Sequence, residues 1–177
     1  MQPGLDSLTL EEPLELIVQR NEVTEPVSIT MRSPGDDAAL AVGFLHGEGI
    51  VRQRTHVVDC VVESGKVIVE LSDSCSFDID QLKRHFYATS SCGVCGRTSI
   101  EAFTANEPPT IDRDVPAVSS DMLASLADRL KSAQETFEKT GGLHAAALFH
   151  SDGSLRLACE DVGRHNAVDK VVGHLFL

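Results

Sequence analysis

Two cysteines separated by two residues form the part of the sequence best suited to chemistry. Cys92 and Cys95 enclose Gly93 and Val94, and small polar residues predominate from position 89 to position 96. Small neighbours leave the thiols accessible. A helix beginning near Cys95 would point its unpaired N–H groups at Cys92 and favour the thiolate. Such a thiolate could carry a sulfane sulfur as a persulfide or attack another thiol.

The same pair has two other interpretations. A structural zinc site normally needs four ligands, but the sequence has no second CxxC, and His85 or His144 could complete a site only through folding. In that case the chain would be a non-catalytic binding or scaffold module. A thioredoxin-type redox role would require the pair to follow a strand in a βαβ unit, which is not the pattern here. The sequence therefore favours a reactive Cys92, with Cys95 as its neighbour.

A second polar cluster lies in a strand-to-helix turn, at residues 160–166. Gly163 would permit an unusual backbone angle, and Asn166 is expected to cap the helix that follows. Arg164, together with the helix N-terminus, suits an anion such as phosphate. The alternative is a buried pair of Asp161 and Arg164 that only fixes the turn.

Other candidate residues carry weaker signals. His144 begins a predicted strand and could face the Asp161 turn as a proton donor or ligand, although a histidine satisfied within the fold is the commoner outcome. Residues 46–48 (HGE) imitate part of a zinc-deaminase signature, but Ser91 stands where that pattern has proline, which indicates a chance match. The remaining cysteines are interpreted as small apolar fillers; they are Cys60, Cys75 and Cys159.

Composition and charge narrow the function further. The 177 residues include 27 acidic and 15 basic side chains, for a formal charge of −12. The electrostatic field of this negative charge repels nucleic acid, and the sequence has no basic patch that would offset the repulsion. No signal peptide and no membrane span are expected. An odd number of unevenly spaced cysteines indicates reduced thiols, so we expect a cytoplasmic protein.

The elements that must position these residues divide into two predicted domains. Residues 1–84 read as a small α+β unit, with strands at 14–21, 27–31, 57–63 and 66–71 and a helix after residue 37. Residues 85–177 contain a helix from Ser119 or Ser120 to Gly141, strands at 143–150 and 155–160, and a final helix. One face of that last helix is expected to carry Val168, Val171, Val172 and Leu175.

The final helical pattern continues to Leu177 without a cap or a closing strand. A helix on one hairpin usually needs more sheet beneath it. We therefore expect an incomplete domain, or one that a partner completes.

Several motifs, in order along most of the chain, resemble those of the FdhD/NarQ family. They are residues 32–37 (RSPGDD), 43–45 (GFL), 48–50 (EGI), 90–96 (SSCGVCG), 142–148 (GLHAAAL) and 160–170 (EDVGRHNAVDK). The resemblance implies an α+β N-terminal unit followed by a three-layer α/β/α cytidine-deaminase-like domain, here partial, because family chains continue past the last helix. A C-terminally truncated and inactive relative is the corresponding alternative.

The resemblance also implies a function. Family members are sulfurtransferases that take sulfur from a cysteine desulfurase and pass it to the molybdenum bis-guanine-dinucleotide cofactor of formate dehydrogenase, often as homodimers. By motif position, Cys92 would bear the persulfide and Cys95 would be its neighbour. The expected cofactor-binding residues are His144, Asp161, Gly163, Arg164 and His165. The cofactor is then an acceptor substrate, and no resident metal or permanent cofactor is expected.

Overall fold

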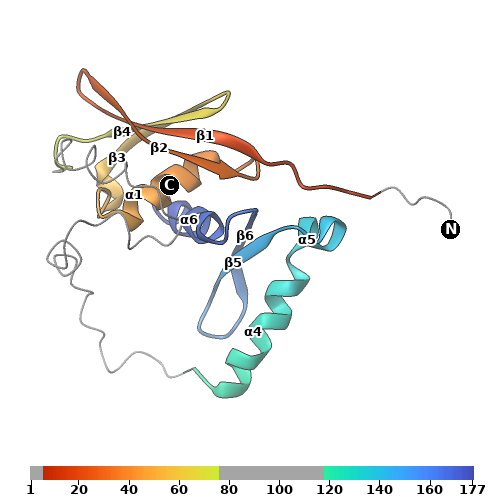
Figure 1. Cartoon of the computed structure of the whole chain (residues 1–177). Helices are drawn as coiled ribbons and strands as arrows, with labels where there is room; N and C mark the ends of the chain where they lie inside the picture. The colour runs from red at the N-terminus through yellow and green to blue at the C-terminus, as the bar shows by residue number, and fades with distance from the viewer. Residues whose placement is uncertain (1–5, 76–117) are drawn as a thin grey trace, which may run out of the picture.

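The computed structural model describes residues 6–75 and 118–177 (Figure 1). Cys92, Cys95 and the predicted domain boundary after residue 84 lie outside these ranges. The role of the two cysteines and the position of the boundary therefore remain predictions. The helices and strands are β1 (Glu12–Arg20), β2 (Val23–Arg32), α1 (Asp37–Gly47), the 3-10 turn η1 (Arg54–His56), β3 (Val57–Glu63), β4 (Lys66–Leu71), α4 (Ser120–Ser132), α5 (Glu135–Thr140), β5 (His144–Phe149), β6 (Leu155–Asp161) and α6 (Arg164–His174).

The first part of the chain forms a four-stranded sheet in the order β2-β1-β4-β3. Each outer pair is an antiparallel hairpin, as predicted, and the two hairpins join through parallel pairing of β1 with β4. The turns between paired strands contain Asn21 and Gly65, both with positive φ. Alternate residues of β1 and β4 point to one face and are buried there: Leu14, Leu16, Val18, Val67, Val69 and Leu71. This face is the core side of the sheet.

Helix α1 packs on that core face and is buried on nearly every side. Leu40, Ala41 and Leu45 are buried, as the helical spacing predicted. Val42 and Gly43 are buried as well, because α6 lies against the opposite side of α1 (Figure 1). The apolar surface of α1 is therefore wider than a single amphipathic stripe, as expected for a helix between two layers.

The contact between α1 and α6 depends on two glycines. A Cβ on Gly43 would lie 1.8 Å from the carbonyl oxygen of Asp169, and a Cβ on Gly173 would lie 1.8 Å from the carbonyl oxygen of Ala39. Each helix thus presents a glycine to the backbone of the other. The helices pack closely because no side chain separates them at these points.

The face of α6 differs from the predicted one. Val171 is buried, but Val168 is 50% exposed and Leu175 is 41% exposed. The buried residues of α6 are Ala167, Lys170, Val171 and Gly173. The prediction followed the large apolar residues, whereas the buried face carries Gly173, which lets α6 pack closely on α1, and Lys170, whose charge is paired with Asp161.

The hairpin of β5 and β6 packs on α6, so the order of layers is four-stranded sheet, α1, α6 and hairpin (Figure 1). Within the two described ranges, no helix is long and apolar enough to cross a membrane. The arrangement is a mixed α/β fold.

The predicted single helix between Ser119 and Gly141 is two helices. Ser119 caps α4 by accepting a hydrogen bond from the Met122 N–H, as expected. Helix α4 ends at Ser132, and a separate helix, α5, begins at Glu135. The carboxylate of Glu160 on β6 accepts hydrogen bonds from the N–H groups of Thr136 and Phe137, at 2.9 and 2.7 Å. A distant side chain thus satisfies the first turn of a new helix.

One carboxyl group at the contact between the helices makes stability depend on pH. Burial, together with a smaller contribution from the nearby charge of Glu48, raises the pKa of Asp169 to about 7. The folded state therefore holds this proton more tightly than the unfolded chain does. The resulting stability is fully present below about pH 4 and is lost as the pH rises through about 7.

The variant Asp169→Asn removes this titration. We expect it to raise the free energy of unfolding by about 1–3 kcal/mol at about pH 8, with much less effect near pH 4. Urea unfolding across this pH range measures the difference. Asp128→Asn, on exposed α4, is the control and should give no comparable pH dependence. Equal loss of stability at both pH values in Asp169→Asn would contradict the prediction.

Candidate functional site

The turn between β6 and α6 is built around a buried ion pair. The carboxylate of Asp161 lies 2.8 Å from Nζ of Lys170, and both side chains are almost completely buried. One oxygen of Asp161 accepts hydrogen bonds from the Gly163 N–H at 2.8 Å and from Nδ2 of Asn166 at 2.9 Å. The other oxygen accepts one from the Ser33 N–H at 3.2 Å. Four donors therefore surround this single carboxylate.

The ammonium group of Lys170 also has several hydrogen-bond partners. Besides Asp161, its Nζ donates to the carbonyl oxygens of Ser33 at 3.0 Å and Glu160 at 3.3 Å. The hydroxyl of Ser33 accepts a hydrogen bond from the Val162 N–H at 3.0 Å. The two sequence motifs at 32–37 and 160–170 are thus joined by charge-assisted hydrogen bonds.

The partner of Asp161 differs from the predicted alternative. Asp161 pairs with Lys170, whereas Arg164 is exposed at the first turn of α6. The prediction did not identify Lys170 as this partner. The available signal was its position on the helix, since Lys170 shares a face with Ala167 and lies beside Val171, and a lysine among buried residues needs an anionic partner.

The turn itself also differs from the prediction in two details. Gly163 is the N-cap residue of α6 and has an ordinary φ of −95°, so it supplies no unusual backbone angle. Its role is spatial, because a Cβ there would lie 2.8 Å from Nδ2 of Asn166. Asn166 does not cap the helix; its side-chain amide donates to Asp161 and to the carbonyl oxygen of Met31.

The remaining predicted site residues lie at the rim of this network. Arg164 and His165 are neighbours and both are exposed on the first turn of α6. His144 is exposed at the start of β5, and its register partner on β6 is Asp161. The fold therefore brings His144, Asp161, Gly163, Arg164 and His165 to one end of the hairpin. A role for these residues in binding a cofactor remains a prediction.

A second ion pair orients the loop that contains Ser33. Nε of Arg32 lies 2.9 Å from one oxygen of Asp37, and Nη2 lies 2.9 Å from the other. Nη1 of Arg32 also pairs with Glu12 at 3.2 Å. The hydrogen bonds from Arg32 to Asp37 raise the pKa of the guanidinium above its usual value. Asp37 therefore fixes the start of α1 in addition to its favourable position at the helix dipole.

The residues that imitate a deaminase signature have structural partners. Nδ1 of His46 lies 2.7 Å from the carbonyl oxygen of Val51, and its ring lies 4.6 Å from that of Phe176. Through these contacts His46, near the end of α1, packs against Val51 and Phe176. Such a structural role agrees with the interpretation of residues 46–48 as a chance match to the deaminase signature.

The described residues thus define a mixed α/β protein in which two separate motifs meet at a buried ion pair. A family model described as the FdhD/NarQ family matches residues 9–177. The chain belongs to the FdhD/NarQ family, which confirms the resemblance found in the sequence.

Its relatives include proteins named sulfur carrier protein FdhD. The one from Streptomyces avermitilis is 44% identical over 180 residues, which cover 95% of this chain and 62% of the relative. The one from Mycobacterium tuberculosis is 40% identical over 185 residues, covering 97% and 65%. The one from Picrophilus torridus is 40% identical over 173 residues, covering 97% and 64%. The chain thus spans less than two thirds of the length of these relatives.

A solved structure has the same fold. The crystal structure described as a formate dehydrogenase accessory protein from Desulfotalea psychrophila superposes with a TM-score of 0.65 at 21% identity. The match covers 97% of this chain and 62% of the other. The similarity establishes the mixed α/β fold for this chain.

Proposed function

We propose that this chain is the sulfur-carrying part of a sulfurtransferase that matures formate dehydrogenase. Cys92 accepts sulfur from a cysteine desulfurase as a persulfide, with Cys95 beside it in the sequence. The acceptor substrate is the molybdenum bis-guanine-dinucleotide cofactor. The observation that carries this proposal is a Cys92-Gly93-Val94-Cys95 sequence in a chain whose relatives are named sulfur carrier proteins.

The geometry of the described residues supports an acceptor of this kind. Arg164 and His165 are exposed side by side on the first turn of α6. A helix N-terminus with a cationic side chain on its first turn suits the phosphates of a guanine dinucleotide. The Asp161–Lys170 pair holds this turn against the loop of Ser33. Arg164 and His165 therefore extend from a turn whose position is fixed.

The proposal includes the assembly around the chain. The protein works in the cytoplasm as a homodimer, and residues 85–177 form the N-terminal part of a domain with the three-layer α/β/α arrangement of cytidine deaminases. The partners are the desulfurase that donates sulfur and the formate dehydrogenase that receives the finished cofactor. The name of the similar solved structure, a formate dehydrogenase accessory protein, supports the link to formate dehydrogenase.

The test is sulfur loading of the chain. Incubation with a cysteine desulfurase and cysteine should add the mass of sulfur to the intact protein, and a thiol reductant should remove it. Cys92→Ala should abolish this addition, because no thiolate remains at the accepting position. Cys60→Ala, which removes a half-buried thiol on β3, is the control and should load normally.

Two results would contradict the proposal. One is a Cys92→Ala variant that still gains sulfur, and the other is a chain that gains none. A stoichiometric zinc ion that is lost in a Cys92→Ala/Cys95→Ala chain would favour the scaffold alternative instead.

A further inference from the structure

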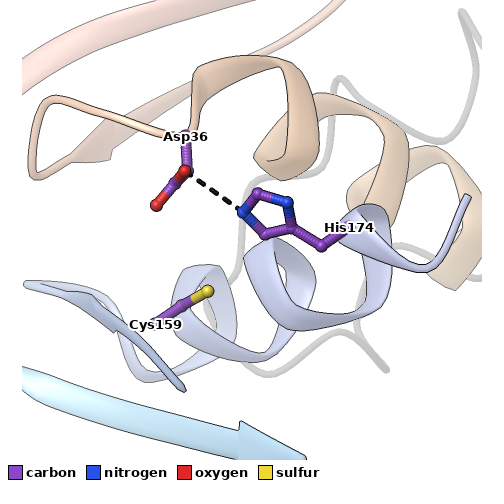
Figure 2. Close-up of side chains that lie close together, drawn as sticks. All are labelled: Asp36, Cys159 and His174. Carbon is purple, nitrogen blue, oxygen red and sulfur yellow. Dashed lines mark hydrogen bonds and ion pairs between the residues drawn. The ribbon is translucent and has the colours of Figure 1, made fainter. Parts of the chain in front are cut away.

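Three side chains from different parts of the fold converge on one point beside the contact of α1 and α6. Asp36 precedes α1, Cys159 lies on β6, and His174 is the last residue of α6. The carboxylate, thiol and imidazole ligand atoms all lie within 4.8 Å of one another. Figure 2 shows the sulfur of Cys159 pointing toward the other two side chains. They form the one such group found among the described residues.

We propose that Asp36, Cys159 and His174 bind a Zn²⁺ ion, with water as the fourth ligand. Nitrogen, oxygen and thiolate sulfur are the ligand set that zinc accepts, at about 2.0–2.3 Å from the ion. A tetrahedral site places its ligand atoms about 3.5 Å apart. The carboxylate of Asp36 and Nε2 of His174 are 3.1 Å apart, and all three ligand atoms lie within 4.8 Å of one another, so side-chain movements of about 1 Å bring them to this spacing.

The backbone at Asp36 suits this role. Asp36 has a φ of 56°, in the left-handed region, and its side chain makes no capping hydrogen bond to α1. A non-glycine residue in this conformation carries local strain. The carboxylate of Asp36 forms a hydrogen bond with Nε2 of His174 at 3.1 Å instead, as Figure 2 shows.

Burial and charge at the site match a cation with one open position. Cys159 is buried, whereas the side chains of Asp36 and His174 are 49% and 35% exposed, so an ion and a water molecule can enter from the solvent side. The C-terminal end of α6 carries the negative end of the helix dipole, which favours a cation. Without an ion, burial and the charge of Asp36 raise the pKa of the Cys159 thiol to about 11, against an opposing effect of Lys170. A bound zinc ion would displace that proton.

The proposal is independent of Cys92, and its test removes that residue. A Cys92→Ala/Cys95→Ala chain, stripped of metal, is titrated with Zn²⁺ in competition with a coloured chelator. One Zn²⁺ per chain is the expected result. Adding Asp36→Asn, Cys159→Ala or His174→Ala should weaken binding about 100-fold or more, since loss of a ligand exceeds the cost of losing an outer partner. Co²⁺ should give a thiolate charge-transfer band that disappears in Cys159→Ala.

Matched controls exclude binding elsewhere and loss of the fold. Cys60→Ala and His150→Ala remove a thiol and an imidazole outside the cluster and should leave the affinity unchanged. Asp36→Asn keeps a residue that tolerates the left-handed backbone. If Cys159→Ala fails to fold, the zinc affinities of the variants at the exposed positions Asp36 and His174 test the proposal. The proposal is overturned if the Cys92→Ala/Cys95→Ala chain binds no zinc, or if Asp36→Asn and His174→Ala bind it as tightly as that chain does.

Discussion

Replacing Lys170 with methionine should lower the free energy of unfolding by about 3–5 kcal/mol. The substitution keeps a long side chain but leaves Asp161 as a buried charge without its cation. It also leaves the carbonyl oxygens of Ser33 and Glu160 without a donor that lies 3.0 and 3.3 Å away. Chemical denaturation of the two proteins measures the loss.

The ion pair of Lys66 and Glu63 provides a matched control. Its nitrogen–oxygen distance is also 2.8 Å, but its side chains are 40% and 49% exposed. Lys66→Met should therefore cost much less than Lys170→Met, because solvent screens an exposed ion pair. A loss for Lys170→Met no greater than that for Lys66→Met would show that the buried pair does not stabilise the turn.

A double-mutant cycle isolates the interaction itself. Asp161→Asn removes the charge and keeps one accepting oxygen, but it replaces the other oxygen, which also accepts here, with an NH2 donor. Combined with Lys170→Met, it should be less destabilising than the sum of the single changes by about 1–3 kcal/mol. If the losses of stability from the two single changes simply add, the destabilisation does not come from the ion pair.

Replacing Gly43 with alanine should destabilise the protein by about 2–3 kcal/mol, although alanine favours an isolated helix by about 1 kcal/mol over glycine. The new methyl group would lie 1.8 Å from the carbonyl oxygen of Asp169 and 2.6 Å from its carbonyl carbon. These are backbone atoms, so no side chain can rotate away, and α6 must move from α1. Thermal and chemical unfolding both measure this loss.

Gly47 on the same helix is the control. The nearest atom to a Cβ at Gly47 is Oδ1 of Asp169, at 3.9 Å, which is ordinary contact. Gly47→Ala should be neutral or stabilise by up to about 1 kcal/mol. Gly173→Ala should behave like Gly43→Ala, because its Cβ would meet the backbone of Ala39. Equal effects of the substitutions at positions 43 and 47 would contradict the close helix contact.

Local sequence patterns predicted the elements whose signals lie within a few residues of one another. The bounds of β3 and β4 agree with the predicted residues 57–63 and 66–71, because β-branched runs around Ser64 and Gly65 specify a hairpin without help from distant residues. The Ser119 cap of α4 is likewise a local hydrogen bond. The reactive Cys92 is an inference from the motif and from family membership alone.

The tertiary structure decided which distant groups meet. Glu160 divides one predicted helix into α4 and α5, Lys170 supplies the charge for Asp161, and glycine contacts choose the buried face of α6. Asp36, Cys159 and His174 are separated by many residues and follow no motif spacing. Periodicity reports which side of an element is apolar, but it carries no information on the partner that approaches. The identity of that partner depends on how the layers pack, so these contacts could only be found in the folded chain.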